Sequence, residues 1–407
     1  MALDSPLRER RIGRALLPLG LVFLAVGISM ALVVPFLSLF LSTAVHAGPV
    51  KVTVFLVAAP LAGVFASSLI GRLSDRWAIR RPLLIGTSVA GVLGSGLTAF
   101  VRDYWILLAL AVTATALAGA LFPQSFAYAR QVMARDSPGQ AAMGVSTLRT
   151  VFSVAWVAGP PLAAFLLDSG GFVYVYGLAA AMYAIAALIA IRWLDEVEAP
   201  ASVIPAADAR PVEDAPEASR RRLLLTVAAF TLLQCPLTLG AQALPLFIGT
   251  DLGGHVADAG LILGLCALLE IPLMLGFGWL TTRVRLRTLV LVGAGGGVAY
   301  EVLAATASGV GVLAAGQIVN ALFIASVSGL GITYLQDMLP RHPGRATTLF
   351  TNTFPIGAVL AGPLFGLAQH FGFRLAYGIG AVLCAAGLLL LFVVPPQPRI
   401  DRRRSAL

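Results

Sequence analysis

The chain has 407 residues, of which 58% are hydrophobic and only 12% charged, and its mean hydropathy is +0.90. A soluble protein of this length needs far more charge to cover its surface, so these values exclude a soluble fold. The net charge of +9 does not indicate a nucleic-acid-binding surface, because the basic residues fall in short clusters between apolar runs.

The apolar runs are long and continuous, whereas a transmembrane barrel would show short segments of alternating polarity. Helices satisfy every backbone polar group within lipid, so we predict an all-α membrane protein. Runs of about 20 residues predict twelve transmembrane helices, in the order 15–41, 52–70, 82–101, 104–128, 141–167, 172–191, 223–249, 259–280, 288–307, 310–334, 346–369 and 375–394.

The orientation follows from the distribution of Lys and Arg between the predicted spans. Of the 28 basic residues, 24 fall in segments on the side of the N-terminus and three in segments on the other side. The remaining one, Arg149, lies within the fifth span. Under the positive-inside rule this asymmetry predicts that both termini are cytoplasmic.

The loop between spans 6 and 7 differs in composition from the others. Residues 195–222 are rich in Ala, Pro and acidic residues and show no periodicity, which predicts a disordered cytoplasmic linker. It separates an N-terminal six-helix bundle, 1–194, from a C-terminal one, 223–407.

The two predicted bundles repeat one another at an offset of a little over 200 residues. Four matches occur in the same order, namely 34–38 with 244–248, 71–81 with 278–287, 138–139 with 343–344 and 158–160 with 361–363. Parallel repeats of six spans, related by an axis along the membrane normal, predict a transporter with a central cavity between its halves.

The segment GRLSDRWAIRR, residues 71–81, resembles the loop signature of the major facilitator superfamily, which also lies between spans 2 and 3. The resemblance implies a gating role for Asp75 and Arg76, in which the carboxylate ties cytoplasmic helix ends together. Attraction of a carboxylate to a helix N-terminus gives this role a physical basis. The alternative is that the arginines only anchor the topology.

A narrower resemblance covers most of the chain. The segments LRTVFSVAWVAGPPLAAFL, LEIPLM and YLQDMLPRHPGRATTLFTNT are similar to those of the bacterial sugar efflux transporter family. This implies proton-linked export of sugars or glycosides across the bacterial inner membrane. AGPPLAA also resembles the span 5 signature of drug–proton antiporters, but Ala155, Ala163 and Ala164 replace its glycines, so a multidrug antiporter is the alternative.

Span 5 carries the candidate substrate site. Arg149, Ser153 and Trp156 are spaced to lie on one helix face, together with Ser146. A charge in the bilayer persists where it faces a wet cavity or a partner, and a guanidinium suits paired hydroxyl groups. The indole offers a flat surface to a sugar ring. The alternatives are an arginine that reaches the cytoplasmic surface and a tryptophan that only packs.

The pair Arg149 and Trp156, seven residues apart, also looks like the sugar-binding pair on the fifth helix of lactose permease. That permease adds a glutamate on its fourth helix, where this chain has no acid and offers only Gln124. The resemblance therefore implies a sugar site that is not identical.

Acidic residues within the spans are Glu270 in span 8 and Glu301 in span 9. Glu270 is predicted to lie about 16 Å from either end of its span and at a depth similar to that of Arg149. A nearby guanidinium favours the ionised carboxylate and low dielectric favours the neutral form, so we expect Glu270 to couple proton binding to transport. The alternative for Glu270 is a neutral carboxyl group that is hydrogen-bonded to a neighbour. Glu301 lies nearer the outer end, where we expect it to be solvated, and the alternative is that Glu301 carries the proton.

Buried amides and one further acid complete the candidate residues. Amides suit a substrate rich in hydroxyl groups, although each can equally bind a neighbouring helix. Asp337, at the cytoplasmic end of span 10, is expected to serve in gating or to be solvated. The candidate amides are Gln234, Gln242, Gln317, Asn320 and Asn352.

Other classes of function fit less well. A membrane enzyme would need clustered His, Cys or carboxylate groups near one interface, and a receptor would need neither the repeat nor the buried charge. We expect a monomer in the lipid bilayer whose partners are a sugar or glycoside and protons, with no nucleic acid, metal or cofactor.

Overall fold

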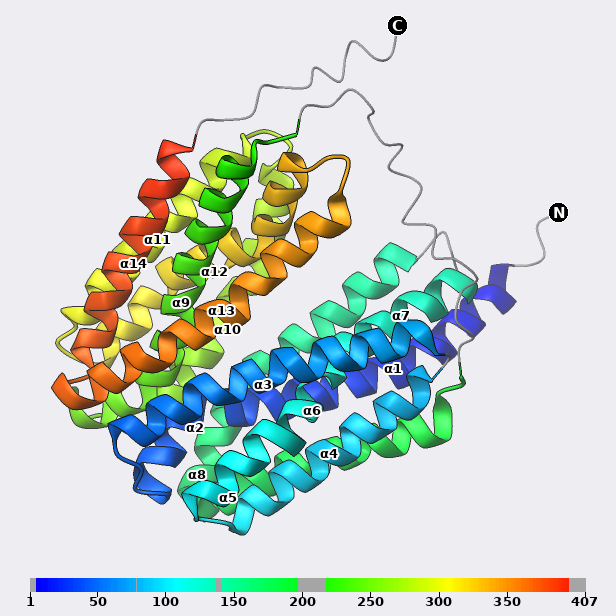
Figure 1. Cartoon of the computed structure of the whole chain (residues 1–407), viewed down its shortest axis with the longest axis horizontal. Coiled ribbons are helices and arrows are strands. Elements are labelled where there is room, and N and C mark those ends of the chain that lie inside the picture. Colours follow the sequence, from blue (N-terminus) through cyan, green and yellow to red (C-terminus); the bar gives the residue numbers. More distant parts are fainter. Residues whose placement is uncertain (1–4, 78, 137–140, 197–216, 395–407) are drawn as a thin grey trace, which may run out of the picture. The chain divides into compact units, whose positions relative to one another are not determined.

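The computed structural model describes the backbone of residues 5–77, 79–136, 141–196 and 217–394, and their side chains except those of 5–16, 75, 134–136, 141–143, 145 and 146. Every regular element in this part of the chain is helical (Figure 1). Eleven of these described helices are long and apolar enough to cross a membrane. The predicted all-α membrane architecture is confirmed.

The first half contains two spans that are built from several short helices, and three long helices. α1 continues through two short turns and α2, and the fourth span is built from α5 to α7 with a wide turn between them. The helices are α1 (Ser5–Val33), α2 (Leu37–Leu39), α3 (Pro49–Arg76), α4 (Arg80–Phe100), α5 (Tyr104–Leu110), α6 (Ala116–Gly119), α7 (Leu121–Asp136) and α8 (Ala141–Trp193).

The second half consists of long single helices joined by short loops. They are α9 (Arg220–Thr250), α10 (Val256–Leu280), α11 (Leu286–Ala305), α12 (Val310–Met338), α13 (Pro343–Phe371) and α14 (Arg374–Val393). α13 begins at Pro343, three residues before the predicted start of the span, because Pro is favoured in the first turn, where its missing N–H costs nothing. The corresponding Pro138-Gly139 lies outside the described residues.

α8 is long enough to contain two spans. Gly171 within it has φ 68° and ψ −162°, a conformation that is not helical and that is open essentially to glycine alone. The sequence predicts a break between residues 167 and 172, and the structure places it there. Dividing α8 at Gly171 gives the twelve predicted spans.

Contacts divide the chain into two compact units. The first unit comprises Met1–Ser202 with Leu244–Leu268, and the second comprises Val203–Ala243 with Leu269–Leu407. Residues 197–216, most of the predicted linker, lie outside the described part, so the bundle boundaries expected from the sequence stay predictions.

The first unit is organised around α8, which packs along both α1 and α4. Small residues allow this approach: a methyl group at Gly91 of α4 would lie 2.5 Å from the Tyr183 ring of α8. Ser29 of α1 donates a buried hydrogen bond of 3.1 Å to the carbonyl of Ala179. Close packing and interhelical hydrogen bonds, rather than apolar burial, hold helices together in lipid.

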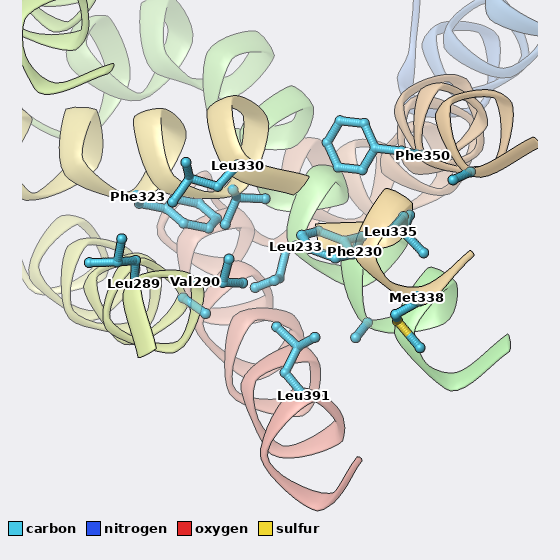
Figure 2. Close-up of a cluster of buried hydrophobic side chains, with 14 of the residues drawn as sticks. Phe230, Leu233, Leu289, Val290, Phe323, Leu330, Leu335, Met338, Phe350 and Leu391 are labelled. Atoms are coloured by element: carbon cyan, nitrogen blue, oxygen red, sulfur yellow. The ribbon is translucent and has the colours of Figure 1, made fainter. Parts of the chain in front are cut away.

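The second unit has a core of aliphatic and aromatic side chains supplied by α9, α11, α12, α13 and α14. Figure 2 shows Phe230 and Leu233 of α9 among side chains of the other helices, with Leu391 of α14 beside them. α11 packs along both α12 and α14. These contacts place the polar residues of α11 between two neighbouring helices.

Candidate functional site

The predicted substrate face lies on the first half of α8. Arg149 is exposed, whereas Ser153 and Trp156 are half-buried. α8 is helical throughout this stretch, so residues four and seven positions apart share one face. The Ser153 hydroxyl donates to the carbonyl of Arg149 at 3.2 Å, a bond within its own helix. The side chain of Ser146 lies outside the described residues.

α1 covers one side of this face. Ala155 is 1% exposed, and a methyl group at Gly27 of α1 would lie 2.7 Å from its Cβ. The backbone of α8 at Gly159 comes equally close to Ala31. The contact with α1 therefore takes the side of α8 next to Trp156.

α10 covers the opposite side. A methyl group at Gly264 would lie 2.8 Å from the carbonyl oxygen of Val157 and 2.7 Å from Cγ of Pro161. One at Gly260 would lie 2.6 Å from the carbonyl oxygen of Pro160. Arg149 and Trp156 thus form a stripe between two tightly packed flanks, on which the Arg149 side chain is exposed.

The candidate amides lie in different environments. Gln317 of α12 is 1% exposed and donates to the hydroxyl of Tyr300 at 3.1 Å, and Asn320 donates to Gln317 at 2.9 Å. The first bond ties α12 to α11, which favours the alternative that Gln317 holds two helices together, whereas the second lies within α12. Asn352 of α13 is exposed.

The two candidate amides of α9 are buried. Gln242 is 6% exposed and Gln234 is 2% exposed. The Nε2 atom of Gln234 has no hydrogen-bond partner within the described part of the chain. The backbone of α13 lies close to this residue, as a methyl group at Gly357 would be 3.1 Å from Gln234 Cβ. Gln234 is therefore a packed residue with an unused donor. Gln124, the expected substitute on span 4, is also buried, at 6%.

Of the two carboxyl groups within the spans, one is more buried than the sequence predicts. Glu270 of α10 is half-buried. Glu301 of α11 is only 2% exposed, so the expectation that it is solvated is wrong. It does lie near the end of its helix, but α9 and α14 cover it there through Gly240 and Gly380.

The predicted gating residues stand at helix ends. Arg76 is the last residue of α3 and is exposed, while the side chain of Asp75 lies outside the described residues. Asp337 is exposed next to the end of α12, where Gln336 donates to the hydroxyl of Thr347 on α13 at 3.1 Å.

No role is predicted from the sequence for Tyr377, Gly240 and Gly380, which lie close to Glu301. The only signal was the presence of glycines inside apolar spans, and such glycines are too frequent in membrane helices to single these out.

The chain matches the family model described as Major Facilitator Superfamily over residues 19–300 and 237–406. It is 32% identical to sugar efflux transporter A of Escherichia coli (strain K12) over 383 residues, which cover 94% of this chain and 96% of that protein. It is 34% identical to sugar efflux transporter A of Dickeya chrysanthemi over 365 residues, covering 88% of this chain and 91% of that protein.

Solved structures show the same fold at low identity. The crystal structure of the nucleoside transporter NupG superposes with a TM-score of 0.73 at 15% identity, covering 93% of this chain and 98% of that one. An auto-inhibited POT family peptide transporter superposes with a TM-score of 0.76 at 12% identity, covering 96% and 98%. With these relatives and this fold, the chain belongs to the sugar efflux transporter family of the major facilitator superfamily.

Proposed function

We propose that this protein exports sugars or glycosides across the bacterial cytoplasmic membrane in exchange for protons, by alternating access. The observation that carries the proposal is the identity of about one third, over nearly the whole chain, to proteins named sugar efflux transporters. The excess of basic residues on one side supports cytoplasmic termini.

In this proposal the stripe on α8 binds the sugar. Arg149 presents a planar set of N–H donors to adjacent hydroxyl groups, and the face of Trp156 packs against the C–H groups of the ring. Ser153 adds a hydroxyl nearly one helical turn before the indole on the same face. The packed flanks on α1 and α10 support this role, because a binding side chain must be held by rigid neighbours.

The candidate amides supply further hydrogen-bonding groups for the sugar. Gln234 has a buried donor that no described group uses, which suits a substrate hydroxyl reached during the transport cycle. Gln242, Asn320 and Asn352 are the further candidates. Asn320 already donates one amide hydrogen bond to Gln317.

Proton coupling is assigned to Glu270. It lies in the middle of α10, the helix whose first half packs against the stripe-bearing part of α8. Movement of α10 in the transport cycle would change the surroundings of this carboxyl group and hence its affinity for a proton. Asp75, Arg76 and Asp337, at the cytoplasmic helix ends, are the proposed gating residues.

The test is transport by the purified protein in lipid vesicles loaded with labelled lactose, glucose analogues or thioglycosides, with and without a pH gradient. We expect sugar movement that accelerates when the gradient drives protons in the opposite direction. Vesicles without protein give the background. Transport of hydrophobic drug cations but of no sugar would replace the proposal by a multidrug antiporter.

Glu270→Gln tests the coupling in the same vesicles. The variant should lose acceleration by the gradient and retain exchange of sugar across the membrane, because the amide cannot release a proton. A Glu270→Gln protein that still responds to the gradient would remove Glu270 from the coupling role.

A further inference from the structure

Glu301 is the most deeply buried acidic side chain in the described part of the chain, at 2% exposure. It lies on α11, one helical turn before the last residue, Ala305. One turn corresponds to about 6 Å along the helix axis. The carboxyl group is therefore close to the membrane surface on which α11 ends and is nevertheless shielded from water.

The shielding comes from two helices that carry glycine opposite the carboxyl group. A methyl group at Gly380 of α14 would lie 2.7 Å from the carboxyl carbon of Glu301, and its contact with Oε2 would be closer still. A methyl group at Gly240 of α9 would lie 4.0 Å from Oε1. The carbonyl of Gly240 also accepts a 3.3 Å hydrogen bond from the hydroxyl of Tyr377 on α14. The chain thus encloses the carboxyl group between α9, α11 and α14.

In the described part of the chain, the titratable groups that interact with Glu301 are tyrosine and cysteine side chains. Tyr377 and Cys384 of α14 and Cys235 of α9 lie within electrostatic range of its carboxyl group. On its own helix the neighbouring Tyr300 accepts a hydrogen bond from Gln317 of α12. No salt bridge to Glu301 forms among the described residues. A buried carboxylate without a cation is costly, so the enclosed arrangement is that of a neutral acid.

A cation nevertheless contacts α11 one helical turn after Glu301. The guanidinium of Arg374, the first residue of α14, donates to the carbonyl of Ala305 at 3.0 Å. Ala305 follows Glu301 by one turn on α11, and Arg374 precedes Tyr377 by one turn on α14. The carboxylate of an ionised Glu301 could therefore move by about one helical turn to reach Arg374 and the water at the ends of α11 and α14.

We infer that Glu301 is a second proton-binding site, whose proton holds α14 against α11 and whose loss loosens this contact. When the O–H bond of the carboxyl group breaks, the proton passes to water at the end of α11, and the carboxylate moves away from Gly380 toward Arg374. Rebinding of a proton restores the enclosed arrangement. The inference deepens the proposed proton coupling, on which its role in transport rests.

Infrared difference spectroscopy of the purified protein tests the site directly. Spectra recorded in detergent in acidic and alkaline buffer should contain a carbonyl band of a protonated carboxylic acid that disappears as the pH rises. The band should persist in Glu270→Gln and be lost in Glu301→Gln. A band that survives in Glu301→Gln with full intensity would overturn the inference.

Substitutions at two glycines of α14 test whether the Glu301 carboxyl group is enclosed, and they leave the acid in place. They keep the inference testable if Glu301→Gln does not fold. Gly380→Ala places a methyl group against the carboxyl group, whereas a methyl group at Gly378, on the same helix, meets nothing within 4 Å. Gly380→Ala should shift the midpoint of the infrared titration toward that of a water-exposed carboxyl, and Gly378→Ala should leave it unchanged. Equal midpoints in the two variants would contradict the enclosed site.

The spectroscopic readout separates this inference from the proposed function. A protein that moves no sugar in vesicles but shows the Glu301 band would refute the proposed export and retain the proton site. A protein that exports sugar in a gradient-dependent manner without the band would refute the proton site alone.

Discussion

Arg81 and Arg287 make the same contact in the two units. The guanidinium of Arg81, at the start of α4, donates to the carbonyls of Ala190 and Ile191 in the last turn of α8, at 3.2 and 2.6 Å. That of Arg287, at the start of α11, donates to the carbonyls of Leu391 and Phe392 in the last turn of α14, at 3.1 and 2.8 Å. Each arginine supplies donors to carbonyls that the end of a helix leaves unpaired.

Removal of this cap should destabilise the protein. Arg287→Ala leaves the last carbonyls of α14 without a cation and should lower the free energy of unfolding by about 1 kcal/mol, the upper value for a charge at an exposed helix end. Thermal unfolding in detergent measures the effect. Arg285→Ala is the control, because Arg285 is exposed and makes no side-chain hydrogen bond within the described residues. Equal stability of the two variants would show that the cap contributes nothing.

The break in α8 should depend on glycine at position 171. Gly171→Ala forces an L-residue into a conformation that costs about 1 to 3 kcal/mol, and it should lower the thermal midpoint. Its methyl group would meet nothing within 4 Å, so the cost is conformational rather than steric.

Gly177→Ala, six residues further along α8, is the matched control. A methyl group there also meets nothing within 4 Å, but the backbone is helical, so the substitution should raise stability by about 0.5 to 1 kcal/mol. Opposite shifts of the two midpoints are expected. A stabilising Gly171→Ala would mean that α8 runs straight through this position.

A side chain at position 264 should destabilise the protein, because α10 packs closely on α8 there. Gly264→Ala sets a methyl group against a backbone carbonyl and a proline ring, neither of which can rotate away, and should cost about 1 to 3 kcal/mol. Gly276→Ala on the same helix faces open space and should not destabilise. Thermal unfolding compares the two, and an unchanged midpoint for Gly264→Ala would contradict the observed contact.

Trp156 should determine sugar affinity under the proposed function. Loss of its ring in Trp156→Ala should raise the KM for sugar about tenfold, which corresponds to about 1.4 kcal/mol of binding. Trp156→Phe retains a smaller flat face and should have an intermediate effect.

The control for this substitution is Trp279→Ala at the end of α10. Trp279 is 57% exposed and lies under the guanidinium of Arg283, whose carbon is 4.2 Å from the ring centroid. It stands at the end of α10, whereas Gly260 and Gly264, which pack on α8, lie in the first half of that helix. Vesicle transport at varied sugar concentration should show no change in KM for this variant. An increase in KM as large as that of Trp156→Ala would indicate a general loss of fold rather than a lost contact.

The position of the spans could be read from the sequence because lipid imposes a length and a composition on each helix separately. For example, the predicted span 310–334 corresponds to α12, Val310–Met338, and the break predicted after residue 167 is at Gly171. The common face of Arg149, Ser153 and Trp156 was predictable for the same reason, since it depends only on the helical repeat.

The burial of Glu301 could not be predicted in this way. It depends on Gly240 and Gly380, each more than 60 residues away in the chain, which allow α9 and α14 to approach α11. The exposure of Asn352 and the bond between Gln317 and Tyr300 likewise depend on which helices pack together. Hydropathy and periodicity are properties of one segment, and they determined the helices and their polar faces. Which of those faces pack against one another depends on side-chain volumes in distant segments, so only the tertiary structure shows it.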